Sequence, residues 1–170
     1  ELTNYRVYRE AAIDFPRRGT HDLHVIVGHG GAGKTNLMNA MSWCLYGEER
    51  YIPADMAGLP LQHQDPETFP GPQDKKVSVR LTMSRCSEQC TEDSTDLFTR
   101  TLDGGRSVFR HQKISSGELI TDENNDAATR YANRLIPHRL KSYYLFDCEK
   151  IQDFLFSQAA SELQPTLEFL

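Results

Sequence analysis

The glycine-rich segment at residues 28–35 constrains this chain more than any other part of its sequence. It reads GHGGAGKT and satisfies the pattern G-x-x-x-x-G-K-[S/T] in full. Glycines allow successive backbone N–H groups to turn inward around an anion without a Cβ clash. Lys34 adds a cation, and Thr35 adds a hydroxyl that is a suitable ligand for Mg²⁺. The segment therefore predicts a phosphate-binding loop, followed by a helix whose positive N-terminal end faces the same anion.

The segments on either side of this loop complete the pattern. Residues 25–27 are the β-branched run Val-Ile-Val, which predicts a short buried strand. Apolar residues then recur at spacings of three and four between Leu37 and Leu45, which predicts a helix packed on a sheet, and Gly47 is expected to end it. The residues expected to hold the nucleotide phosphates are Gly28, His29, Gly30, Gly31, Ala32, Gly33, Lys34, Thr35 and Asn36.

The same glycines also match the dinucleotide pattern G-x-G-x-x-G, through Gly28, Gly30 and Gly33. A dinucleotide site requires an acidic residue at the end of a second strand about twenty residues further on. The sequence there is GEERYIPADMAG, which is not typical of a strand. Lys34 and Thr35 would also have no role in a dinucleotide site. The sequence therefore favours the phosphate-binding loop.

Composition excludes several classes of protein. The chain has 170 residues, of which 38% are hydrophobic and 25% are charged, which fits one globular domain with a core of its own. A net charge of −5 argues against a generally basic surface for nucleic acid, although it permits a local basic patch. We find no membrane-spanning run and no signal peptide, and therefore expect a cytoplasmic protein with free thiols. Cys86 and Cys90 have only His111 as a possible third metal ligand, which disfavours a metal site there.

The remaining elements follow from periodicity and turn chemistry. The hairpin predicted around Asp-Gly-Gly carries Arg100, Arg106, Arg110 and Lys113, which we interpret as a solvated face rather than a DNA-binding rim. The segment ISSGEL at residues 114–119 is predicted to be a turn. Two short strands are predicted within residues 1–16, a loop at 51–75 and a strand at 76–83. Further on, we predict a helix with Asn125 or Asp126 as its N-cap that ends before Pro137, a strand at 142–146, and a helix from about Lys150.

The stretch KSYYLFDCE at residues 141–149 allows two interpretations. An apolar run ends at Asp147, with Glu149 two residues later. In one interpretation this is a Walker B strand, with Asp147 on the magnesium side and Glu149 as the base of a self-contained P-loop NTPase or kinase. In the other, this stretch is not a Walker B strand, and the chain is only half of an ATPase.

The order of these segments resembles the N-terminal half of SMC-like ATPases, closest to SbcC-type proteins and the DndD-like ATPases of DNA modification and defence. NYRVY, GKTNLMNAMSWCLYGEE and YLFDCEKI carry the resemblance, which spans nearly the whole chain. It implies an α/β P-loop NTPase fold, namely the N-terminal lobe of an ABC-type head with an antiparallel β-subdomain. Residues 1–150 would form this lobe and residues 151–170 would begin a helix leading towards a coiled coil. We expect the chain to be a fragment without the C-terminal lobe.

The resemblance also implies roles for particular residues. It places Asp147 at the position of the Q-loop, so that Thr35 and Asp147 would be on the magnesium side of MgATP. The implied catalytic set is Lys34, Asp147 and Glu149. Arg6, in NYRVY, matches a basic residue that approaches the nucleotide. Cys148 stands where glycine is usual in these proteins, which predicts a stiffer loop around Asp147.

The function implied is ATP binding, with hydrolysis that requires a C-terminal lobe and a second head in a homodimer. Such a switch would act on DNA in repair or in defence against foreign DNA, with other subunits as possible partners and no membrane association. Two alternatives stay open. The first is the self-contained NTPase or kinase described above. The second is a scaffold that binds ATP without hydrolysing it.

Overall fold

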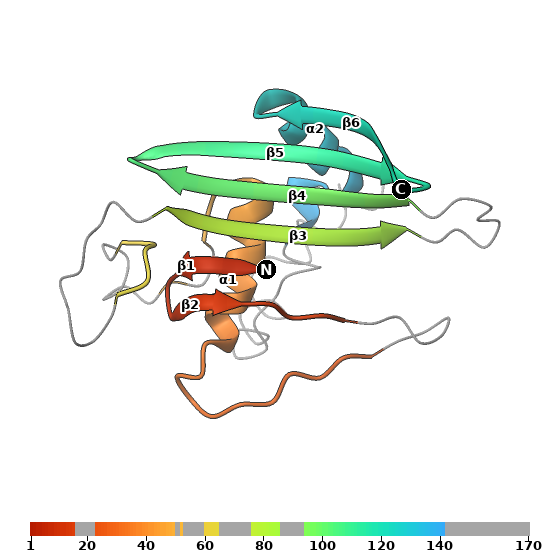
Figure 1. Cartoon of the computed structure of the whole chain (residues 1–170). Helices are drawn as coiled ribbons and strands as arrows, with labels where there is room; N and C mark the ends of the chain where they lie inside the picture. Colours follow the sequence, from red (N-terminus) through yellow and green to blue (C-terminus); the bar gives the residue numbers. More distant parts are fainter. Residues whose placement is uncertain (16–22, 50–51, 53–59, 65–75, 86–93, 142–170) are drawn as a thin grey trace.

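The described part of the chain is built around a six-stranded antiparallel sheet (Figure 1). The computed structural model describes residues 1–15, 23–49, 52, 60–64, 76–85 and 94–141. The elements are β1 (Leu2–Tyr5), β2 (Tyr8–Ala11), α1 (Lys34–Tyr46), β3 (Val77–Arg85), β4 (Ser94–Asp103), β5 (Arg106–Ser115), β6 (Glu118–Asn124), α2 (Asp126–Leu135) and the 3₁₀ helix η2 (His138–Leu140). The strands lie in the order β2-β1-β3-β4-β5-β6, and each neighbouring pair is antiparallel. The mixed α/β architecture and the antiparallel sheet agree with the sequence prediction.

Alternation and tight turns explain the strands. In β3, Val77 and Val79 are buried while Arg80 is exposed, as the two-residue period of a strand requires. The turn between β4 and β5 has Gly104 and Gly105 at φ 51° and 79°, a pair of positive values that suits the twist of a hairpin. The predicted hairpin is therefore confirmed. The predicted turn in residues 114–119 is also confirmed, because it joins β5 to β6.

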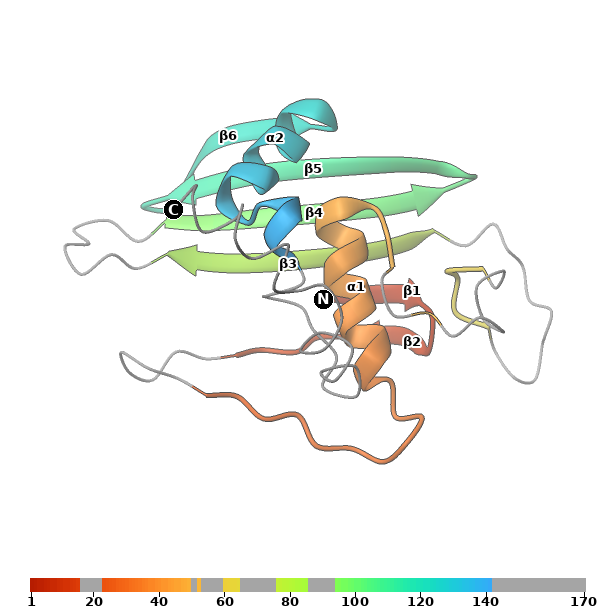
Figure 2. The same ribbon diagram turned by 180° about the vertical axis from the view of Figure 1, so that it is seen from behind.

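Both helices lie on one face of the sheet (Figure 2). α1 packs on β3 and β4, and α2 packs on β5 and β6. α1 ends where predicted, since Gly47 has φ 79° and donates its N–H to the carbonyl of Trp43 at 2.9 Å. α2 also ends before Pro137, as predicted. Among the described helices, none is long and apolar enough to cross a membrane.

The core lies between the helices and the sheet. Its largest members are Tyr5, Trp43, Phe98 and Phe109, with the smaller Cys44 and Ala132 among them. The Cys44 thiol is fully buried and lies 3.4 Å from the carbonyl oxygen of Val79. Burial raises the pKa of this thiol to about 12, so that it remains protonated at neutral pH.

A polar cluster is buried beneath α2. His111 Nε2 lies 2.8 Å from Asp96 Oδ1, and both side chains are fully buried. The Tyr131 hydroxyl donates to the same carboxylate oxygen at 3.0 Å, and its ring stacks on His111 at 3.9 Å between centroids. In His111, the possible third metal ligand, Nε2 is thus engaged by Asp96, while Nδ1 lies 3.7 Å from Glu123 Oε2. Cys86 and Cys90 lie outside the described residues, within which no group of three metal ligands occurs.

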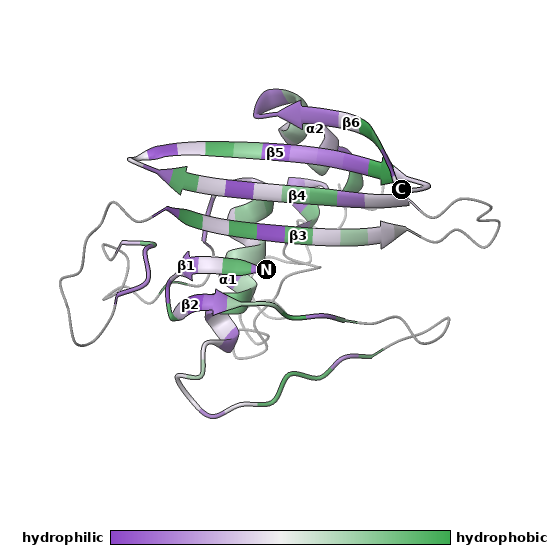
Figure 3. Cartoon of the chain, viewed as in Figure 1, coloured by the Kyte–Doolittle hydropathy of each residue, from purple (hydrophilic) through white to green (hydrophobic). Residues whose placement is uncertain are grey.

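The predicted strand at residues 25–27 is wrong. Residues 23–29 form no strand, and Val25 and Val27 are 73% and 89% exposed. Figure 3 shows this apolar stretch running apart from the sheet. β-branched residues favour a strand only where a pairing partner and a covering layer are present, and the described residues supply neither here.

The interpretation of Arg100 as part of a solvated face is also wrong. Arg100 shares the inner phase of β4 with Phe98, so its side chain points under α1. Its Nε donates to the carbonyl of Cys44 at 2.9 Å, and its guanidinium lies 4.4 Å above the ring of Phe109. Arg110 does lie on the exposed face, where it pairs with Asp122.

Several predictions fall outside the described residues. These are the strand at 142–146, the helix from Lys150, the second domain segment at 151–170 and most of the loop at 51–75. The two short strands predicted near the N-terminus are confirmed as β1 and β2.

Candidate phosphate-binding site

The glycine loop leads directly into the N-terminus of α1. Gly33 occupies the position before the helix with φ 94° and ψ 4°, a left-handed conformation that favours glycine. No side chain caps this end, and the first turn contains no acidic residue. Helix N-termini carry a partial positive charge and unpaired N–H groups, which an anion can satisfy. The end of α1 is therefore suited to a phosphate group.

The turn between β1 and β2 and the start of β2 pack against the glycine loop at Gly33. A Cβ on Gly33 would lie 2.8 Å from Val7 Cγ2 and 2.9 Å from the Tyr8 hydroxyl, so only glycine fits. The Tyr8 hydroxyl donates to the Gly33 carbonyl at 3.0 Å. Sequence analysis missed Val7 and Tyr8 as supports of the loop. Val7 and Tyr8 are far from the loop in the sequence, and no local sequence pattern predicts their contact with Gly33.

Lys34 folds back across the loop. Its ammonium donates to the carbonyl oxygens of Gly28 at 2.6 Å and His29 at 2.9 Å. The Ala32 N–H also donates to the His29 carbonyl, at 3.2 Å, which closes a turn within the loop. The cation therefore lies over the backbone that would surround a phosphate, in the position from which it can neutralise one.

The other predicted ligands lie on the same short segment. Residues 28–32 are exposed, as is Thr35 in the first turn of α1, and Asn36 is half-buried beside it. A Cβ on Gly30 or Gly31 would meet nothing within 4 Å, which shows open space above the loop. Of the predicted residues, those at 28–32 together with Lys34 and Thr35 are exposed, whereas Gly33 is buried against the turn between β1 and β2. The Thr35 hydroxyl thus lies on the residue next to the lysine.

Arg6 lies in the turn between β1 and β2, but its side chain points away from the loop to Glu49. Its Nε and a terminal nitrogen donate to the two Glu49 oxygens at 3.0 and 2.5 Å, and both side chains are nearly buried, at 7% and 6% exposed. The Tyr5 hydroxyl donates to Glu49 as well. The hydrogen bond to Glu49 raises the pKa of Arg6, while burial, more than the neighbouring carboxylate, raises the pKa of Tyr5. A contact between Arg6 and the nucleotide stays a prediction.

Asp147 and Glu149 lie outside the described residues, so their predicted roles stay predictions. The described chain ends at Lys141, six residues before Asp147. The residues that the structure brings together are those of the loop, the start of α1 and the supporting turn.

A glycine loop at an uncapped helix N-terminus, with a lysine folded across it, defines a P-loop nucleotide-binding protein. Residues 1–163 match the family described as AAA domain, and the chain belongs to that family. It is therefore a nucleotide-binding ATPase by family, a class that generally binds ATP and Mg²⁺. No curated protein matches the chain.

Proposed function

We propose that this chain is the N-terminal lobe of an SMC-like ATPase head that binds MgATP. The observation that carries the proposal is the exposed glycine loop at the N-terminus of α1. Backbone N–H groups of residues 28–36 would hold the β- and γ-phosphates, and Lys34 would neutralise their charge. The Thr35 hydroxyl would be a ligand of Mg²⁺. The left-handed Gly33 and the absence of an acidic residue from the first turn of α1 both fit an anionic ligand.

The apolar segment before the loop supports the need for a further lobe. Leu23, Val25, Ile26 and Val27 are 87%, 73%, 48% and 89% exposed, an arrangement unfavourable for a run that directly precedes a phosphate loop. We infer that a C-terminal lobe covers these residues and pairs with them as a strand. That lobe would also supply the Walker B carboxylate, while Asp147 acts from the Q-loop position and Glu149 lies behind it. Without it, the chain would bind nucleotide but would not hydrolyse it.

The resemblance to SMC-like proteins extends the proposal to assembly. A second copy of the head would close over the γ-phosphate in a homodimer, and ATP would favour this closed state more than ADP does. Closure would act on DNA in repair or in defence against foreign DNA, together with other subunits. Hydrolysis would then reopen the dimer.

The test measures ATP binding and phosphate release by residues 1–170, with and without the C-terminal part of the protein. We expect binding without turnover, and turnover when the missing part is added. Lys34→Ala should abolish both, which controls for contaminating ATPases. Turnover by residues 1–170 alone that is lost on Asp147→Ala would instead identify a self-contained NTPase. Binding with no phosphate release under any condition would identify a scaffold.

A further inference from the structure

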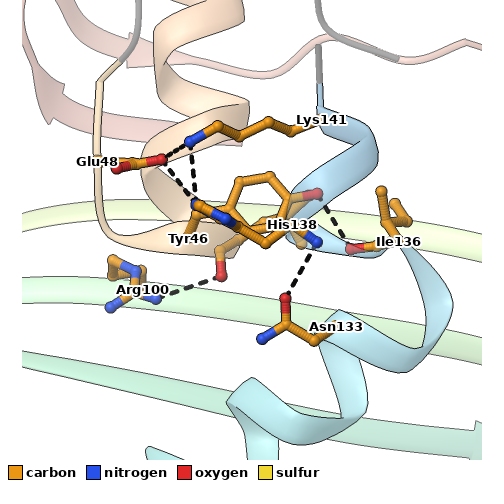
Figure 4. Close-up of polar contacts among 8 residues, drawn as sticks. Tyr46, Glu48, Arg100, Asn133, Ile136, His138 and Lys141 are labelled. Carbon is orange, nitrogen blue, oxygen red and sulfur yellow. Dashed lines mark hydrogen bonds and ion pairs between the residues drawn. The ribbon is translucent and has the colours of Figure 1, made fainter. Parts of the chain in front are cut away.

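The last described residues of the chain are anchored to the C-terminal end of α1 (Figure 4). The Tyr46 hydroxyl donates to the carbonyl of Ile136 at 3.1 Å. The His138 ring meets the Tyr46 ring edge-on, with 5.0 Å between centroids and 79° between planes. Tyr46 thus fixes both the backbone after α2 and the first residue of η2.

One carboxylate completes this contact. Glu48 Oε1 accepts from Lys141 and lies 2.9 Å from His138 Nε2, while the Lys141 ammonium lies 3.0 Å from the same ring nitrogen (Figure 4). His138 either donates to Glu48 or accepts from Lys141, depending on its tautomer. Lys141 donates to Glu48 in both arrangements, whereas His138 donates to Glu48 only in the first. Glu48 therefore accepts at least one hydrogen bond from residues 138–141 in either arrangement.

The contact has a buried part and an exposed part: Tyr46 and Ile136 pack against the core and the Lys141 side chain is 20% exposed, whereas the pair of Glu48 with His138 lies near the surface. The side chains of Glu48 and His138 are 47% and 50% exposed, and ion pairs in such positions contribute little to folding. The end of α1 is already held by Arg100, which donates to the Cys44 carbonyl, and by the turn at Gly47. What Glu48 adds to the contacts of Tyr46 is a hydrogen bond to Lys141, the last described residue.

The position of this contact relates it to the phosphate loop. α1 is a helix of 13 residues, which spans about 20 Å as one rigid rod. The first residue of the helix is Lys34, in the loop, and the last is Tyr46, in the contact. Lys141 is followed after six residues by Asp147. A displacement of α1 that accompanies binding in the loop therefore reaches residues 136–141 through few intermediates.

We propose that Glu48, together with Tyr46, His138 and Lys141, forms a positioning clamp that couples nucleotide in the phosphate loop to residues 136–141. The proposal rests on the proposed function, because it requires that MgATP binds the loop. The coupling requires that α1 shifts when the loop binds nucleotide, and the clamp would then transmit this shift to residues 136–141.

Hydrogen–deuterium exchange in the full chain, with and without MgATP, tests this coupling at both ends of α1. In the wild type, MgATP should slow exchange by about threefold or more in peptides covering residues 28–36 and also in peptides covering 136–141. In Glu48→Gln, which keeps the side-chain shape but removes the charge, the first response should persist and the second should be lost.

Two further variants separate coupling from simple damage. Asp122→Asn breaks the Arg110 pair, which is similarly exposed but lies on the opposite face of the sheet, and it should keep both responses. The exchanged pair Glu48→Lys with Lys141→Glu should regain at least half of the response that Lys141→Glu alone loses.

The outcomes are distinct for the two proposals. If the wild type shows no response at residues 28–36, nucleotide binding itself fails and the clamp proposal fails with it. If residues 28–36 respond but residues 136–141 do not, only the clamp is overturned. The clamp is likewise overturned if Glu48→Gln keeps both responses or if the exchanged pair restores nothing.

Discussion

The two ends of α1 differ in what surrounds them. At the N-terminal end, the loop at residues 28–32 is exposed, and no side chain caps the helix. At the C-terminal end, Arg100 donates to the Cys44 carbonyl, and the Gly47 N–H donates to the Trp43 carbonyl in the last turn. The chain thus places its own cation at the negative end of the helix, whereas no side chain caps the positive end. The positive end is the one at which we propose that nucleotide binds.

Glu49 adds to this difference between the two ends of α1. It binds Arg6, which was predicted to approach the nucleotide, near the C-terminal end of the helix. The Arg6 guanidinium approaches the chain just after α1 rather than the loop. Its neighbour Val7, by contrast, packs on Gly33 at the start of α1. Adjacent residues in one turn therefore serve opposite ends of the same helix.

Removing Glu49 should have the largest effect on stability. Glu49→Ala leaves the Arg6 guanidinium nearly buried and without this partner, which should lower the free energy of unfolding by about 3–5 kcal/mol. Urea denaturation followed by circular dichroism measures the change. The neighbouring Glu48→Gln is the matched control, since Glu48 is 47% exposed and its loss should change stability little. Equal effects of the two substitutions would show that the Arg6 pair is not the stabilising contact.

Gly33→Ala should disrupt the N-terminal end of α1, where we propose that nucleotide binds. The added Cβ would lie 2.8 Å from Val7 in a backbone with φ 94°, and such strain costs about 1–3 kcal/mol. We expect both a lower melting temperature and a loss of ATP binding, measured by differential scanning fluorimetry with added MgATP.

Gly30→Ala is the matched control for the same loop. Its Cβ would meet nothing within 4 Å, so the melting temperature without nucleotide should be unchanged. A melting temperature lowered as far by Gly30→Ala as by Gly33→Ala would contradict the role given to Val7 and Tyr8.

Arg100→Ala should destabilise the C-terminal end of α1, which is the end opposite the phosphate loop. It removes the cation from the carbonyl of Cys44 and the contact with the Phe109 ring, at a cost of about 1–2 kcal/mol. Thermal unfolding measures this loss. Arg80→Ala, which removes an exposed pair with Glu1, should leave the melting temperature unchanged. An equal fall in melting temperature for both variants would show that the contact of Arg100 with the end of α1 is not the stabilising one.

Local rules explain which features could be predicted from the sequence. The glycine loop, the stop at Gly47 and the hairpin at Gly104 and Gly105 each depend on residues close together in the chain. They are determined by glycine conformations and by the spacing of apolar residues, every two residues in a strand and every three to four in a helix, rather than by distant contacts. These features of the fold and of the candidate site were therefore predictable.

Features that depend on distant residues were not predictable. The run at 25–27 has the composition of a buried strand, but exposure is decided by which partners are present. Arg100 looked like one of four hairpin cations, and only the phase of β4 against α1 shows that it caps a helix. The hydrogen bond from Tyr8 to Gly33 joins residues 25 positions apart. No sequence pattern reports such a contact.

That hydrogen bond supplies the finest test of the comparison, with the smallest expected effect. Tyr8→Phe removes only the hydroxyl that donates to the Gly33 carbonyl at 3.0 Å, which should cost about 0.5–1.5 kcal/mol. Because the bond holds the residue that starts α1, part of this loss should appear as weaker ATP binding, measured by calorimetric titration. Tyr131→Phe removes a comparable hydroxyl from Asp96, far from the loop along the sheet, and should lower stability while ATP affinity stays the same. If both variants weaken ATP binding equally, the effect comes from general destabilisation rather than from support of the loop.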